Sequence, residues 1–185
     1  MYWTEPRSRP VRDLGSVPTG HSSMNLNPTI EALVVNLDNA FHGRGWQGTT
    51  LLGSLRGVTA AQAVWRPSNG RRCIWEHALH TAYWKYIVRR TLSPRVGDAF
   101  PRSPSNWPRV PQTPDEQAWR ADISLLKTMH EDLRTVLVRF DPRRLGRVAG
   151  GRKFNALTYI VGAAAHDSYH TGQVQLIKRL MNNHL

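Results

Sequence analysis

The chain has 185 residues, 40% of them hydrophobic, and a single cysteine, Cys73. This length and composition predict one soluble domain with a sizeable core, and one cysteine excludes an intrachain disulfide framework and a cysteine metal cluster. The net charge of +12 comes mainly from arginines scattered along the chain, which favours a basic soluble surface over nucleic-acid binding. No apolar run approaches the roughly 18 residues of a membrane span, so we expect a cytoplasmic protein that does not enter a membrane.

The first 24 residues contain prolines, glycines and serines without hydrophobic periodicity. This pattern predicts a flexible N-terminal tail, and it lacks the apolar core of an export signal. The folded domain is therefore expected to comprise residues 25–185.

Helix start and stop signals divide the next part of the chain. Asn27 can cap a helix that has Pro28 in its first turn, and Gly43 ends this helix. Thr59 begins Thr-Ala-Ala-Gln, which is a capping-box pattern and predicts a short extra helix. A second long helix is expected from about Ile74 to Leu92, because Ser93-Pro94 then stops it.

A proline-dense loop of about twenty residues follows the second long helix. Loops of this length inside a compact domain are usually functional or disordered. Its aromatic residues Phe100 and Trp107 indicate that it packs down as a lid or a pocket wall. Trp46, Trp75 and Trp84 are likewise expected to fill the core or the pocket wall.

Two further long helices complete the chain. One begins at residues 113–116, Thr-Pro-Asp-Glu, and its apolar residues alternate at steps of three and four, with His130 on the same seam. The other runs from Phe154 to about Leu180. Four long amphipathic helices without convincing alternating strands predict an all-α four-helix bundle, with the short extra helix and the proline-rich loop as additions.

The histidines are the strongest chemical signal. His166 and His170 lie one turn apart on one face of the last helix, so both rings can aim at a common point, as metal ligands do. A single histidine on an apolar face is more often a buried, hydrogen-bonded residue, so a purely structural role is the alternative to metal binding. On the second long helix His80 faces the core most directly, and His77 lies nearer the edge of the apolar face.

Two motifs carry a resemblance to a known family. They are Ile74-Trp-Glu-His-Ala-Leu-His80-Thr-Ala-Tyr-Trp84 and Ala165-His166-Asp-Ser-Tyr-His170-Thr-Gly-Gln173. The chain resembles the DinB-like superfamily of metalloenzymes, which includes YfiT-type hydrolases and bacterial thiol S-transferases, over nearly everything from about Asn27 to Leu185. The resemblance implies an up-down-down-up bundle, a homodimer, and a divalent metal bound by His80, His166 and His170.

Other residues are weaker candidates for supporting roles around the site or its pocket. Each has a structural alternative: a surface salt bridge for the glutamate, a core position for the histidine of the third long helix, and packing for the aromatic residues. These candidates are Glu76, His77, Tyr83, Trp84, His130 and Gln173.

The predicted function is a divalent-metal-dependent enzyme that acts on a small molecule, either as a hydrolase or as a low-molecular-weight-thiol S-transferase. Imidazole ligands suit Zn and Ni, and they also accept Fe or Mn, so the ligand set does not choose the metal. The alternative is a non-catalytic metal-binding or stress-response bundle whose histidines hold a structural ion or none.

Overall fold

The computed structural model describes residues 26–43, 45–68, 70–95, 98–148 and 150–182; the predicted tail lies outside these ranges. The described residues form helices and no strand, with one isolated bridge between Val148 and Asn155. The elements are α1 (Pro28–Phe41), α2 (Leu51–Leu55), α3 (Ala60–Val64), α4 (Ile74–Leu92), α5 (Glu116–Val138), the 3-10 helix η1 (Pro142–Arg144) and α6 (Ala156–Asn182).

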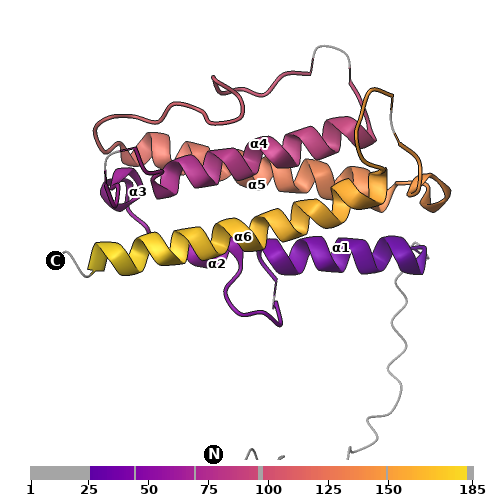
Figure 1. Cartoon of the computed structure of the whole chain (residues 1–185), viewed down its shortest axis with the longest axis horizontal. Coiled ribbons are helices and arrows are strands. Elements are labelled where there is room, and N and C mark those ends of the chain that lie inside the picture. The colour runs from indigo at the N-terminus through magenta and orange to yellow at the C-terminus, as the bar shows by residue number, and fades with distance from the viewer. Residues whose placement is uncertain (1–25, 44, 69, 96–97, 149, 183–185) are drawn as a thin grey trace, which may run out of the picture.

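The four long helices form a bundle in which α4 packs against α5 and α6, and α1 packs against α6 and α5. Figure 1 shows that α1 and α6 run in one direction while α4 and α5 run in the other. Two consecutive helices can be parallel because the loop between α4 and α5 crosses back along the bundle. The predicted all-α bundle with an up-down-down-up chain path is therefore confirmed.

Hydrogen-bonded caps fix the helix starts that the sequence predicts. The side chain of Asn27 accepts from the backbone N–H of Thr29 at 3.0 Å, and Thr59 forms the expected capping box. Asp115 caps α5 by accepting from two backbone N–H groups at 2.9 Å. These caps satisfy amide groups that would otherwise have no partner in the first turn.

Three local features differ from expectation. The helix α2 was not predicted, because its sequence LLGSL is short and contains a glycine, and its packing against α6 supports it. The helix α6 begins at Ala156 rather than at Phe154, after Asn155 caps it by accepting from Thr158 N–H at 2.9 Å. The expected burial of Trp46 is wrong, since this residue is fully exposed.

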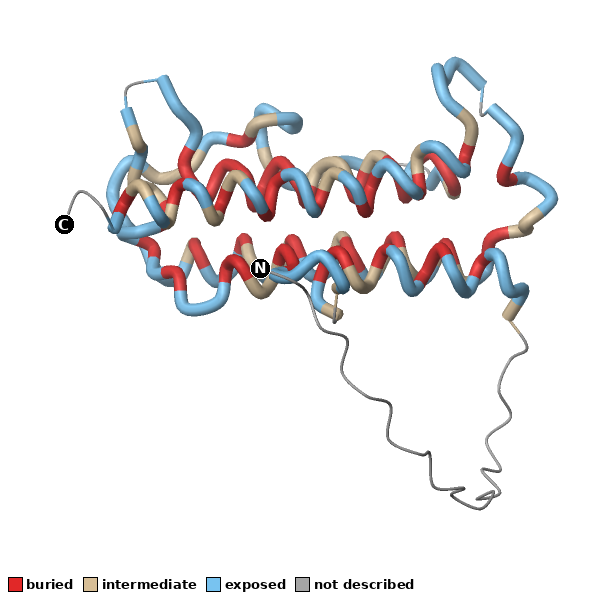
Figure 2. Tube along the Cα trace, turned by 60° about the horizontal axis from the view of Figure 1, so that its bottom comes forward, coloured by how far each residue is buried: buried red, intermediate tan, exposed pale blue. Residues whose placement is uncertain are grey.

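The bundle core consists of two apolar clusters with a polar layer between them. One cluster includes Trp75 and Trp119, and the other includes Leu33 and Ile160. Each long helix contributes a polar residue between its apolar segments, and these residues are Asp38, Lys85, His130 and Asp167. Figure 2 shows buried positions recurring on the inward side of the helices along the bundle.

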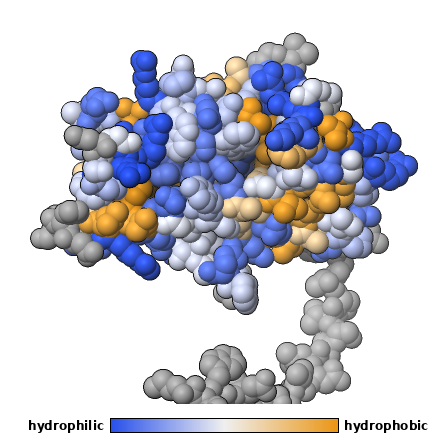
Figure 3. Space-filling view, in the orientation of Figure 1, coloured by the Kyte–Doolittle hydropathy of each residue, from blue (hydrophilic) through white to orange (hydrophobic). Residues whose placement is uncertain are grey.

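The outer surface is mixed. On the face shown in Figure 3, apolar side chains gather toward the two ends of α6, with hydrophilic side chains between them. The exposed large apolar side chains of α6 are Leu157, Val161, Tyr169 and Leu176. Among the described residues, no helix is both long enough and apolar enough to span a bilayer.

Candidate metal centre

Three histidine rings converge between α4 and α6. His80 and His170 are buried and His166 is half-buried, and one ring nitrogen from each lies within 4.8 Å of the other two. Nε2 of His166 is 3.3 Å from Nε2 of His80 and 3.0 Å from Nε2 of His170. The structure thus brings together the three residues that the family resemblance implies as metal ligands.

Hydrogen bonds outside the triad set the orientation of two of these rings. Nδ1 of His80 is 2.7 Å from the backbone oxygen of Asn106, which can only accept, so the His80 proton lies on Nδ1. Trp107 covers the His80 ring and stacks on it, with the ring centroids 3.8 Å apart and the ring planes at 8°. Nδ1 of His170 is 2.9 Å from Nδ1 of His77, so these two nitrogens share one proton.

Burial keeps the imidazoles neutral at physiological pH. Desolvation, together with repulsion between the neighbouring histidines, lowers the pKa of His166 to about 4 and that of His170 to about 2. Desolvation also lowers the pKa of His77 to about 4 and lowers that of His80. Neutral rings with outward-facing Nδ1 protons direct their Nε2 lone pairs inward, as a metal ligand requires.

The donor set fits a divalent ion. A single N–H on His166 cannot satisfy both of its close Nε2 contacts well, whereas a cation between the three rings would accept all three lone pairs. Zinc–nitrogen bonds of 2.0–2.1 Å in a tetrahedron place ligand nitrogens about 3.3 Å apart. The observed separations of 3.3 and 3.0 Å are close to this value.

An apolar pocket of about 580 Å³ opens beside the triad. His80 and His166 form part of its wall, and the rest is mostly aromatic and aliphatic, including Trp84, Trp107 and Phe154. Trp84 Nε1 donates to Oδ1 of Asn106 at 3.1 Å, which ties α4 to the proline-rich loop. The prediction that this loop forms a pocket wall through Trp107 is therefore correct.

The weaker candidates occupy different positions. Trp84 lines the apolar pocket, and Tyr83 packs edge-on against Trp84 and Phe100. Glu76 accepts from two arginines and from the N–H of Cys73, so it closes the start of α4 and does not bond a histidine ring. Gln173 borders a separate pocket next to His77.

His130 lies away from the triad, in the polar layer. Its ring stacks on Phe41 at 3.9 Å, Nε2 is 3.0 Å from Oδ1 of Asp38, and Nδ1 is 3.4 Å from Nζ of Lys85. Asp38, His42 and His130 form a second group with metal-ligand spacing. However, an ion on Nε2 would place the Nδ1 proton of His130 against the Lys85 ammonium, so the structural alternative accounts better for His130.

Sequence reasoning missed two groups near the site. Lys85 donates to Oδ2 of Asp167 at 2.5 Å, and the two side chains are 1% and 0% exposed. A lysine on the buried side of α4 and an aspartate beside His166 were the available signals. Asn106 gave no signal, because a backbone oxygen in a loop has no sequence pattern.

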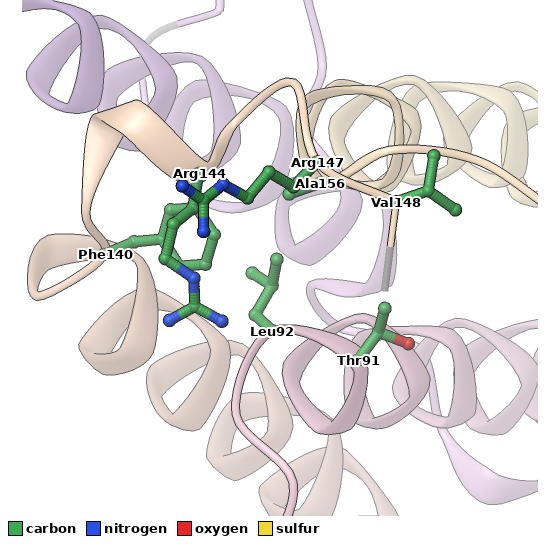
Figure 4. A pocket seen from close by; sticks show the side chains of 7 residues that line it. All are labelled: Thr91, Leu92, Phe140, Arg144, Arg147, Val148 and Ala156. Carbon is green, nitrogen blue, oxygen red and sulfur yellow. The ribbon is translucent and has the colours of Figure 1, made fainter. Parts of the chain in front are cut away.

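A further pocket, of about 170 Å³, lies at the other end of α4 from His77. Figure 4 shows the guanidinium groups of Arg144 and Arg147 beside the ring of Phe140, together with Thr91 and Leu92 at the end of α4. None of the triad residues lines this pocket.

The fold and the triad define a helical-bundle protein with a histidine group that could hold a metal ion. The chain belongs to the DinB superfamily, which is metal-binding, and the family model matches residues 45–174. The matched range includes all three triad histidines. No curated protein and no solved structure matches the chain.

Replacing His77 by phenylalanine is expected to weaken divalent-metal binding by about 10- to 100-fold, because His170 loses the acceptor that orients its ring. Competition with a chromophoric chelator measures the affinity. His77→Gln is the matched variant, since its amide oxygen can still accept a hydrogen bond. Equal affinity for the phenylalanine variant and the wild type would show that His77 does not orient His170.

Metal-free protein is expected to lose stability as the pH falls from about 6.5 toward 4. His77, His166 and His170 have folded pKa values of about 4, 4 and 2, against an ordinary value of 6.5, so only the unfolded chain takes up protons in this window. Each fully buried histidine contributes a slope of about 1.4 kcal/mol per pH unit, and half-buried His166 contributes less.

Urea unfolding in EDTA at pH 7, 6 and 5 measures this slope. His166→Ala should give a shallower dependence, because one of the three groups is absent. An unfolding free energy that stays constant from pH 7 to pH 5 would contradict the low pKa values of these three histidines.

Proposed function

We propose that the protein is a metal-dependent enzyme in which His80, His166 and His170 hold a divalent ion. The observation that carries this proposal is the convergence of three neutral imidazole Nε2 atoms at the edge of a large apolar pocket. Three protein ligands leave coordination positions open, which is typical of catalytic rather than structural zinc sites. When bound, a divalent ion supplies Lewis-acid activation of a substrate oxygen or stabilises a thiolate.

The pocket residues bind and desolvate the substrate. Trp84, Trp107 and Phe154 provide apolar surface that excludes water. Asn106 also lines the pocket, and because its Oδ1 atom accepts from Trp84, the part of its amide that a substrate can still use is the N–H donor side. A small molecule with an uncharged apolar body and one hydrogen-bond acceptor fits this wall.

The wall composition favours thiol transfer over hydrolysis as the first reaction to test. Hydrolysis needs a group that removes a proton from water, and carboxylates and lysines are absent from the described residues of the apolar pocket. A low-molecular-weight thiol ionises more readily than water and needs less help from a base. The pocket would then hold the apolar electrophile to which the thiolate adds.

The test has two parts. Full-length protein is loaded with Zn, Ni, Fe or Mn and assayed with a thiol and an apolar electrophile, such as a chlorodinitrobenzene, and separately with amide and ester substrates. Metal-dependent turnover that disappears in His80→Ala supports the enzyme. Tight stoichiometric metal without turnover of either class would favour the alternative, a non-catalytic metal-binding bundle.

The expected homodimer stays a prediction. The exposed apolar residues of α6, among them Val161 and Leu176, are the surface on which we would test it. Light scattering of the wild type and of Leu176→Glu gives the oligomeric state, and an unchanged dimer in the variant would exclude this surface.

A further inference from the structure

A second pocket borders the triad through His77, and we call it the arginine pocket. It has a volume of about 420 Å³ and lies between the segment that precedes α4 and the C-terminal half of α6. The polar residues on its wall are Ser68, Arg71, Arg72, His77 and Gln173. It shares none of its lining residues with the apolar pocket.

The wall of the arginine pocket offers hydrogen-bond donors that are not fully used. The side chain of Arg71 is exposed and has no ion-pair partner among the residues that the structure describes. His77 is only 7% exposed, and while its Nδ1 contacts His170, its Nε2 has no hydrogen-bond partner within the described part of the chain. The amide of Gln173 likewise makes no described hydrogen bond.

Protonation of the His77 ring follows from its contact with His170. If Nδ1 of His170 donates outward, Nδ1 of His77 must accept, and the single proton of the neutral His77 ring then lies on Nε2. This N–H is a donor on the wall of the arginine pocket. The ring of His77 therefore connects a ligand in this pocket to the orientation of His170.

The charge balance at this pocket is positive. Arg66 and Arg72 both bond Glu76, at 2.6 and 2.9 Å, so each carboxylate oxygen of Glu76 already has an arginine partner. With Arg71 there are three guanidinium groups and one carboxylate, which leaves an excess of two positive charges. The described lining of the arginine pocket includes no acidic residue.

We propose that the arginine pocket binds the oxyanion group, a carboxylate or a phosphate, of a small-molecule co-substrate. Arginine forks pair with planar or tetrahedral oxyanions through two parallel hydrogen bonds. The triad then lies between a site for an anionic molecule and a site for an apolar molecule. This assignment rests on the proposed function for the word co-substrate, but the anion site itself can be tested without turnover.

Isothermal titration of the full-length protein with succinate, inorganic phosphate and uncharged succinamide, at constant ionic strength, tests the proposal. Succinate or phosphate is expected to bind, and succinamide is not. Arg71→Gln should weaken binding of the anion about tenfold or more, as expected for loss of a charge-assisted hydrogen bond. Arg71→Lys should restore part of the affinity. Arg152→Gln is the matched control, since it removes the same charge from an exposed residue outside the pocket.

A third variant, His166→Ala, separates this proposal from the metal site. Unchanged anion binding in His166→Ala together with weakened binding in Arg71→Gln supports the arginine pocket, whether or not the triad holds an ion. Loss of binding in His166→Ala with full binding in Arg71→Gln would place the anion at the triad and overturn the proposal. Equal effects of Arg71→Gln and Arg152→Gln, or no binding of either anion to the wild type, would also overturn it.

Discussion

Replacing His166 by alanine is expected to abolish stoichiometric binding of a divalent metal. His166 is the central member of the triad, because its Nε2 lies within 3.3 Å of both other Nε2 atoms. Removing an outer partner of a ligand already costs about 10- to 100-fold in affinity, so loss of a ligand itself should cost more. Elemental mass spectrometry should find about one equivalent in the wild type and almost none in the variant.

Thermal unfolding provides a second measurement on the same proteins. At a free metal concentration of about 100 times its dissociation constant, the wild type should gain roughly 2.7 kcal/mol of stability, and His166→Ala should gain none. In EDTA the variant should be at least as stable as the wild type, because it lacks the repulsion between the closely spaced Nε2 lone pairs of the triad.

The control for this prediction is His42→Ala, which removes an exposed histidine from the group with Asp38 and His130. It should bind metal like the wild type. If His42→Ala loses the ion and His166→Ala retains it, the ion lies in the polar layer and the triad assignment is wrong.

The buried pair of Lys85 and Asp167 is expected to give the largest stability effect in the bundle. Burial lowers the pKa of Lys85 and raises that of Asp167, so the cost of desolvation outweighs their mutual attraction for each group. Asp167 Oδ1 has no hydrogen-bond partner among the described residues, and removing Lys85 would leave the whole carboxyl group unpaired there. Lys85→Met should therefore lower the unfolding free energy by about 3–5 kcal/mol.

The double variant Lys85→Met/Asp167→Leu should recover most of this loss, because an apolar pair of similar volume has no charge to desolvate. Urea unfolding of the metal-free wild type, the two single variants and the double variant measures this double-mutant cycle. Lys127→Met, at an exposed position of α5, is the control and should change stability by less than about 0.5 kcal/mol. If the losses of unfolding free energy in the two single variants simply add in the double variant, the two side chains do not stabilise each other.

Much of the fold can be predicted from local sequence signals. Helix α4 begins and ends as predicted at Ile74 and Leu92, because proline stops it and its apolar residues recur at helical spacing. The spacing of His166 and His170 places both rings on one side of α6 regardless of tertiary context. The choice of His80 rather than His77 as the third ligand came from the family resemblance, and helix geometry added only that His80 faces the core more directly.

The remaining features depend on contacts that no local pattern encodes. The short helix α2 owes its formation to packing against α6, which outweighs the weak helix preference of LLGSL. The bond between His80 and the Asn106 backbone joins residues 26 positions apart. Trp46 was expected inside because tryptophan is usually buried, and its full exposure reflects its place in the turn after α1.

The loop between α4 and α5 couples local order to ligand affinity. Its backbone holds His80 through Asn106, and its Trp107 ring covers the same imidazole. Earlier in the loop, Asp98 bonds Arg89 of α4, and Arg102 donates to Asp122 of α5 at 2.8 Å, so the part of the loop before Asn106 is anchored to two long helices. By thermodynamic reciprocity, an ion that favours the oriented His80 must also favour the ordered loop. Any change that loosens the loop must weaken ion binding by the same coupling free energy. Hydrogen exchange of the loop amides should therefore slow when metal is added, although no loop side chain is a ligand.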